Sequence, residues 1–173
     1  MSTSLGKQPE EAGTATPDTS MEDYQHKIRS GTGIRRPSFS KATQVTISKH
    51  EGLHVVLPTT ASHATSSGTV SNIERCVIDL SPPTKNGAPF DVLYLRNIKD
   101  SLIICGQVAG AIHITDVSNS ALVTACRQFR MHGSKDVDIY LHSTSRPIFE
   151  DCEGLQFAPL PEAYVSLTTN SNR

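Results

Sequence analysis

One arginine in this sequence stands in a setting that suits chemistry on a partner protein. Arg130 lies between Phe129 and Met131, inside the run of residues 126–133. Alternate side chains of a β-strand point to opposite faces, so a strand here would turn Phe129 and Met131 inward and Arg130 outward. A guanidinium is permanently charged and presents its donors in a rigid fork. Held on a stiff strand, it can complete the active site of another protein.

The elements that would hold Arg130 appear as a sequence repeat. From Phe90 onward, four segments align at steps of 19, 17 and 18 residues. The columns expected to face inward are Leu93, Ile112, Phe129, Pro147; Leu95, Ile114, Met131, Phe149; Ile98, Val117, Ser134, Cys152; and Ile103, Leu122, Ile139, Phe157. The turn-forming columns are Asn97, Asp116, Gly133, Asp151 and Asp100, Asn119, Asp136, Gly154. Asn, Asp and Gly tolerate the left-handed backbone that a sharp corner requires.

This repeat predicts an all-β fold, a parallel β-helix. The apolar spacing within each segment is two rather than 3.6, which excludes helices. An antiparallel sandwich would not require the same residue types to recur in register. In a β-helix, equal positions of successive coils stack about 4.8 Å apart, so recurrence is expected. The chain supplies at least four coils, with a possible fifth at residues 76–80.

The rest of the chain divides by composition. Residues 1–45 are polar and rich in Ser, Thr, Pro and Gly, which predicts a disordered segment. Residues 46–160 would form the domain, and residues 161–173 a polar tail. Short strands are expected at 44–48, 53–57 and 76–80, and a Thr/Ser/Ala-rich loop at 58–70.

Composition excludes several functional classes. The formal net charge of the 173 residues is −1, which offers no field of one sign to attract nucleic acid or an anionic membrane. The four cysteines are far apart and none forms a CxxC pair, so we expect free buried thiols and no metal. There is no membrane-length apolar stretch, signal-peptide pattern or myristoylation site. We expect a cytoplasmic protein without membrane anchor or cofactor, and without a phosphate-binding loop for GTP of its own.

The outward columns beside Arg130 predict a surface patch. These columns are Tyr94, His113, Arg130, Ile148 and Arg96, Thr115, His132, Glu150. Arg130, His132, Ile148 and Glu150 should therefore lie together across two coils. The alternative is that Arg130 and Glu150 form a surface ion pair of little energetic value, with His132 simply solvated.

Several spaced motifs resemble the tubulin-binding cofactor C domain family. They are Ala125-Cys126-Arg127-Gln128-Phe129-Arg130, Lys135-Asp136, Thr144-Ser145-Arg146-Pro147-Ile148, Glu150-Asp151-Cys152 and Gly154-Leu155-Gln156-Phe157-Ala158-Pro159. The resemblance covers about residues 90–159 and implies a right-handed parallel β-helix. The family includes a tubulin-folding cofactor and an activator of an Arf-like small GTPase. Two departures are a polar N-terminus too short for the family's helical region, and a polar tail after Pro159 where relatives continue with aromatic residues.

The resemblance also implies roles for individual residues. In activating members the motif's arginine acts as an arginine finger, and it maps onto Arg130. Gln128 matches the second motif glutamine, Arg127 replaces the first, and Glu150 matches an interface carboxylate. The implied function is GTPase activation, with β-tubulin and the other tubulin-folding cofactors, or an Arf-like GTPase in its GTP state, as partners. The replacement at Arg127 favours an alternative, a β-helix module that binds a cytoskeletal or GTPase partner without catalysis.

Overall fold

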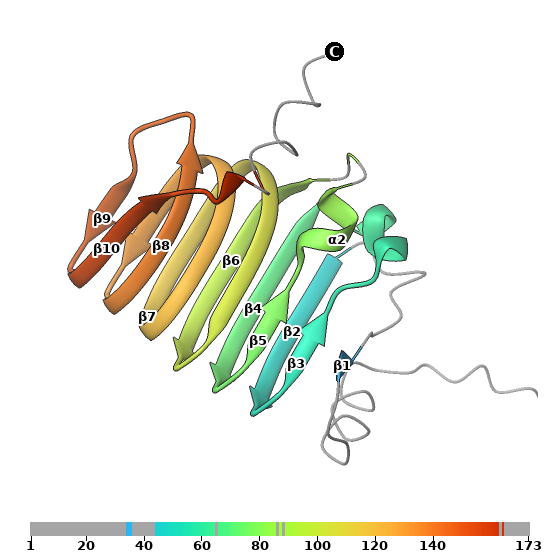
Figure 1. Cartoon of the computed structure of the whole chain (residues 1–173), viewed down its shortest axis with the longest axis horizontal. Helices are drawn as coiled ribbons and strands as arrows, with labels where there is room; N and C mark the ends of the chain where they lie inside the picture. Colours follow the sequence, from blue (N-terminus) through green and yellow to red (C-terminus); the bar gives the residue numbers. More distant parts are fainter. Residues whose placement is uncertain are drawn as a thin grey trace, which may run out of the picture.

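The chain folds into a stack of β-strand coils (Figure 1). The computed structural model describes residues 34–35, 44–64, 66–85, 87, 89–162 and 164. In chain order the elements are β1 (Ile34–Arg35), β2 (Gln44–Glu51), β3 (His54–Val56), the 3-10 helix η1 (Thr59–Ala64), β4 (Ser67–Glu74), β5 (Val77–Asp79), α2 (Ser81–Thr84), β6 (Phe90–Lys99), β7 (Leu102–His132), β8 (Lys135–Ser143), β9 (Ile148–Glu150) and β10 (Glu153–Pro159).

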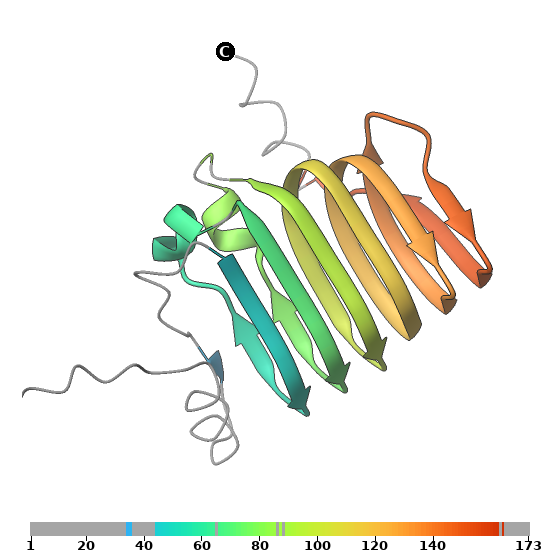
Figure 2. The same ribbon diagram turned by 180° about the vertical axis from the view of Figure 1, so that it is seen from behind.

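Strand pairing among these elements is parallel throughout. One layer stacks β2, β4 and β6 and continues into β7, while a second layer stacks β1, β3 and β5 against the start of β7. The views from the two sides show these layers as tilted ribbons running from β2 and β3 to β9 and β10 (Figures 1 and 2). Further along, β8 pairs with β7 and β10, and β9 pairs with β7. The predicted parallel β-helix is confirmed, with about six turns.

Left-handed residues form the corner between the two layers. Both predicted turn columns have positive φ, between 45° and 66°. Each column extends two coils further toward the N-terminus, to Lys49 and Asn72 in one and to Gly52 and Arg75 in the other. Asn97 donates a hydrogen bond of 2.7 Å to Asn72 on the coil before it. The corners are therefore cross-linked between coils by their own side chains.

The inward columns form one continuous core. Leu93, Ile112 and Phe129 are fully buried, as are their equivalents in the neighbouring columns. Phe149 and Phe157 belong to the same columns but are 46% exposed, because they lie in the last coil and no described strand covers them. Burial along each column thus follows the position of the coil in the stack.

The structure corrects the expected loop at 58–70. Residues 59–64 form η1 and residues 67–70 begin β4, a full coil strand that the sequence pattern does not predict. The inward position Gly68 has no side chain because Phe90 and Leu93 of the next coil fill the space. A Cβ at Gly68 would meet Leu93 Cδ1 at 2.8 Å.

The predicted disorder of residues 1–45 falls almost entirely outside the described residues. Within that segment, Ile34 and Arg35 form β1 and pair with His54 and Val55, and Gln44 and Val45 begin β2. Among the described residues, no helix has the length and apolarity needed to cross a membrane.

Candidate functional site

Arg130 projects from a strand whose neighbouring side chains are locked in the core. Phe129 is fully buried and Met131 is 2% exposed, whereas Arg130 is exposed. The Phe129 ring lies edge-to-face with the Phe157 ring, at a centroid distance of 6.5 Å. Because both flanking side chains are fixed by packing, the backbone that carries Arg130 is preorganised.

The predicted patch around Arg130 is assembled as expected. Arg130 pairs in register with Ile148, and His132 pairs with Glu150. Ile148 is 46% exposed, and Glu150 and His132 are exposed too. The four side chains therefore share one outward surface. We give the name Arg130 face to the surface formed by the outward residues Tyr94, Arg96, His113, Arg130, His132, Ile148 and Glu150.

The positive charge of Arg130 is not neutralised by a carboxylate within the described part of the chain. The ion pairs there involve Arg75, Lys135 and His132, and Arg130 is in none of them. In particular, Glu150 does not pair with Arg130, which was the alternative offered by the sequence. His132 instead places Nδ1 3.6 Å from Asp151 Oδ2. Arg130 is thus available to a negative group on a partner.

The pKa of His113 is affected by the unpaired charge of Arg130. Its coil neighbour Tyr94 pairs with it in register, and the offset between Ser118 and its partner Lys135 places Arg130 on the other side of His113. Burial lowers the pKa of His113 below its ordinary value, and the charges of Arg130 and Arg96 lower it further. The imidazole is therefore neutral near pH 7 and does not add to the charge of the face.

Arg127 and Gln128 lie at the end of the coil away from the left-handed corner, where β7 turns into the stretch that carries Arg130, and both are exposed. The Arg127 carbonyl accepts hydrogen bonds from Ser145 Oγ at 2.8 Å and Ser145 N at 3.1 Å. The Ser143 and Thr144 hydroxyls also donate to it. These contacts tie residues 143–145 of the next coil to the start of the Arg130 strand, a positioning role that the sequence pattern alone does not predict.

The cysteine of the motif is a packing residue. Cys126 is 5% exposed, and burial raises the pKa of its thiol to about 11. A thiol in this state supplies little thiolate and is a poor nucleophile. Among the described residues, His, Cys, Asp and Glu side chains form no group of three that could hold a metal.

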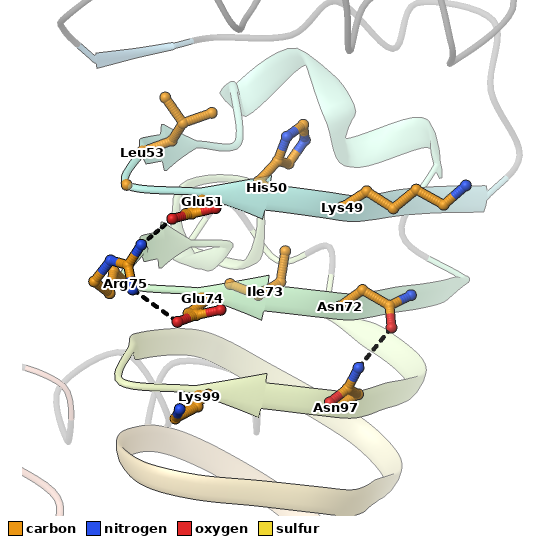
Figure 3. Close-up of a pocket in the computed structure, with 11 residues that line it drawn as sticks. Lys49, His50, Glu51, Leu53, Asn72, Ile73, Glu74, Arg75, Asn97 and Lys99 are labelled. Carbon is orange, nitrogen blue, oxygen red and sulfur yellow. Dashed lines mark hydrogen bonds and ion pairs between the residues drawn. The ribbon is translucent and has the colours of Figure 1, made fainter.

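A groove lies at the left-handed corner of the first three coils, and Arg75 there is already paired with carboxylates. The groove has a volume of about 650 Å³ and includes Lys49, Asn72 and Lys99 in its lining. Across it, Arg75 bridges Glu51 and Glu74, the latter at 2.7 Å (Figure 3). The groove arises where the corner residues of successive coils stack, which the fold itself requires. Arg130 therefore remains the better candidate for a functional residue.

Three further residues of the face were not singled out by the sequence as functional. The rings of Tyr94 and His113 stack with centroids 5.2 Å apart and planes 15° apart. The Arg96 guanidinium lies over Tyr94, 5.2 Å from the ring centroid. The sequence signal that could have identified these residues is their position in the same outward columns as Arg130 and His132.

The fold and the site together define a class of protein: a parallel β-solenoid that presents an exposed arginine, without a paired carboxylate among the described residues, on its side. The family model of tubulin binding cofactor C matches residues 65–173, more than half of the chain. The chain belongs to the tubulin binding cofactor C family.

Individual relatives agree with this assignment. The chain is 37% identical over 98 residues to tubulin-specific chaperone C of Bos taurus, covering 57% of this chain and 27% of the relative. It is 40% identical over 77 residues to the Homo sapiens protein of that name, covering 44% and 22%. Tubulin-folding cofactor C of Arabidopsis thaliana is 36% identical over 91 residues, covering 53% and 25%. The matches span about a quarter of the length of these relatives.

Proposed function

We propose that this protein activates a GTPase by supplying Arg130 in trans. The observation that carries the proposal is an exposed, unneutralised guanidinium fixed between two buried neighbours, Phe129 and Met131. GTP hydrolysis builds negative charge on the γ-phosphate and on the leaving oxygen. A guanidinium placed there stabilises the transition state more than the ground state. A preorganised arginine meets this requirement without a further ordering step.

Neighbouring residues have supporting roles in this proposal. Gln128 points to the same side of the strand as Arg130 and assists at the nucleotide, with Arg127 beside it. Ile148, His132 and Glu150 form the docking contact around the finger. The nucleotide belongs to the partner in this proposal, because the sequence contains no glycine-rich phosphate-binding loop with its lysine.

Tubulin is the first candidate partner, because the relatives are named as tubulin chaperones and folding cofactors. The protein would act in the cytoplasm or on the cytoskeleton, on β-tubulin held with the other tubulin-folding cofactors, during tubulin complex assembly. An Arf-like small GTPase in its GTP state is the second candidate, implied by the family resemblance.

A phosphate-release assay tests the proposal. Purified protein is mixed with GTP-loaded αβ-tubulin plus the other folding cofactors and, separately, with GTP-loaded Arf-like GTPases. Arg130→Ala should remove the stimulated hydrolysis, about 10³-fold or more if the finger has its usual effect. Arg130→Lys should recover little, because a lysine cannot present the planar fork. Lys135→Ala, which removes an exposed cation at the start of β8, is the matched control and should keep full stimulation.

The competing function is a binding module without catalysis. The specific observation in its favour is Arg127, which stands where the family motif has a glutamine. In that case the parent protein binds a GTPase and leaves its hydrolysis rate unchanged. Arg127→Gln separates the two functions further. A gain of stimulation in that variant would show that Arg127 had weakened an otherwise competent finger.

A further inference from the structure

The Arg130 face changes character from coil to coil. Its two outward columns begin with small hydroxyl side chains and acquire large ones only at β6. The hydroxyl positions in register below Tyr94 and Arg96 are Thr46, Ser48, Thr69 and Ser71. Large aromatic and cationic side chains are therefore confined to the part of the face nearest to Arg130.

Tyr94, His113 and Arg96 are arranged as a preformed stack. The Tyr94 ring lies against His113 on the next coil, and Arg96 covers the same ring from its own strand. A cation over an aromatic face is attracted by the ring quadrupole. Each side chain thus restricts its neighbours, so ordering these side chains when a partner binds costs less entropy than ordering free rotamers would.

The position of the stack fits a single interface with Arg130. Tyr94 lies one coil before His113, and His113 one coil before Arg130. At about 4.8 Å per coil, Tyr94 and Arg130 are roughly 10 Å apart. A standard protein interface covers about 800 Å² of each partner, which easily includes both points.

The electrostatics of the stack indicate the chemistry of what it binds. Within the described residues, Arg96 contacts Tyr94 but no carboxylate is within ion-pair distance of it. Its in-register neighbours are the uncharged Ser71 and Thr115, and the other groups nearby are the Tyr94 ring, the neutral His113 and, further along, Arg130. An incoming carboxylate would find a fork-shaped partner with no internal competitor, and charge-assisted pairs of that kind are the strong ones.

We propose that Tyr94 and Arg96 form a second anchor for the partner GTPase, docking an acidic surface patch in which a carboxylate meets Arg96. Tyr and Arg are the residue types that most often dominate binding energy at interfaces. In this proposal the Tyr94–Arg96 anchor increases the affinity for the GTPase, and Arg130 increases the rate of GTP hydrolysis. This inference rests on the proposed function, because it takes the same GTPase as the partner.

The test measures binding and rate separately. The probes are αβ-tubulin and an Arf-like GTPase, each loaded with a non-hydrolysable GTP analogue for Kd, and with GTP for phosphate release. Arg96→Glu should raise Kd by about tenfold or more while the rate at saturating protein stays at the parent value. Tyr94→Ala should raise Kd in the same direction. Arg130→Ala should show the reverse pattern, with lost rate and retained binding.

Lys99→Glu is the matched control, since it makes the same charge change on β6, at the corner beyond Arg96. It should leave Kd nearly unchanged, and the melting temperature of each variant, measured alongside Kd, shows that the variant is folded at the assay temperature. The anchor is overturned if Arg96→Glu and Tyr94→Ala bind the probe as the parent does. A parent protein that binds neither probe overturns the proposed function itself, whereas one that binds without stimulating hydrolysis leaves the anchor testable through Kd alone.

Discussion

His113 and Arg130 occupy one outward column on successive coils, and Arg96 lies close enough to affect the same imidazole. The two guanidinium charges and burial all disfavour a proton on His113. A neutral imidazole between two cations limits the repulsion that the face would otherwise store. Lowering the pH adds a third charge to this small area, so the face is sensitive to acid.

The pH dependence of stability tests this arrangement. The pKa of His113 is lower in the folded state than its ordinary value of 6.5. The unfolded chain therefore binds this proton first, so the folded state loses stability as the pH falls below about 6.5. His113→Gln should flatten this part of the profile. Melting temperatures of parent and variant are compared from pH 7.5 to pH 5, where the gap should close or reverse.

Identical slopes in the two proteins would contradict the placement of Arg130 and Arg96 around His113. The expected difference is small, because His113 is only partly buried.

At the level of single residues, the sequence predicted orientation well and contacts poorly. Period two sufficed to turn Arg130 outward, because Phe129 and Met131 can only be accommodated in the core. The stack of Tyr94, His113 and Arg96 depends on side-chain rotamers and on the offset between coils, neither of which a column alignment contains.

Small polar side chains at the corners hold successive strands together. Ser101 Oγ donates to the Lys99 carbonyl at 2.7 Å and accepts from Cys76 N of the preceding coil at 3.0 Å. Ser120 repeats both contacts one coil later, with Ser118 and Ser101. Backbone groups that the turn removes from the regular ladder are thereby satisfied.

Removing one of these hydroxyls should therefore destabilise the coil. Ser101→Ala leaves the buried N–H of Cys76 without its acceptor, which typically costs about 1–3 kcal/mol. Urea unfolding of the variant should show a lower midpoint with an unchanged slope. The control is Ser118→Ala, since the Ser118 hydroxyl makes no hydrogen bond among the described residues. If both variants unfolded at the same urea concentration, the bridging role of Ser101 would be wrong.

Strand prediction was good downstream of Phe90 and incomplete upstream. The downstream coils carry apolar inward residues together with Asn, Asp or Gly at the corners. The upstream strand β4 has Gly68 at an inward position, and the corners nearby use Lys49 and Arg75 in the left-handed conformation. Glycine has little preference for a strand interior, and lysine and arginine have little preference for a left-handed corner. These residues therefore do not predict the strand from the sequence, and contacts with the neighbouring coils impose its geometry.

The molecule as a whole is a stack in which each coil contacts mainly its neighbours, so its two ends differ from its middle. At the C-terminal end, β9 pairs only with β7, and β10 only with β8, among the described strands. Phe149 and Phe157 contact each other at a centroid distance of 5.3 Å and remain 46% exposed. Their equivalents one coil earlier are almost fully buried.

Hydrogen exchange should reveal this gradient. Amides of β9 and β10 should exchange well before those of β6, because local opening at an end breaks one set of inter-coil contacts and opening in the middle breaks two. Exchange followed by mass spectrometry on peptides of β10 and β6 measures the difference under native conditions. Uniform protection across both peptides would instead indicate that the stack opens only as a unit.

Coil length varies along the chain without disturbing the stack. The coils between successive corners carry η1 in one case and α2 in the next, yet the corner residues before and after them stay in register. Extra chain is thus absorbed at the end of each coil away from the corner. In the two coils that carry η1 and α2, that end is where a fluorescent reporter or a purification handle can be spliced into the polypeptide while the Arg130 face keeps its geometry.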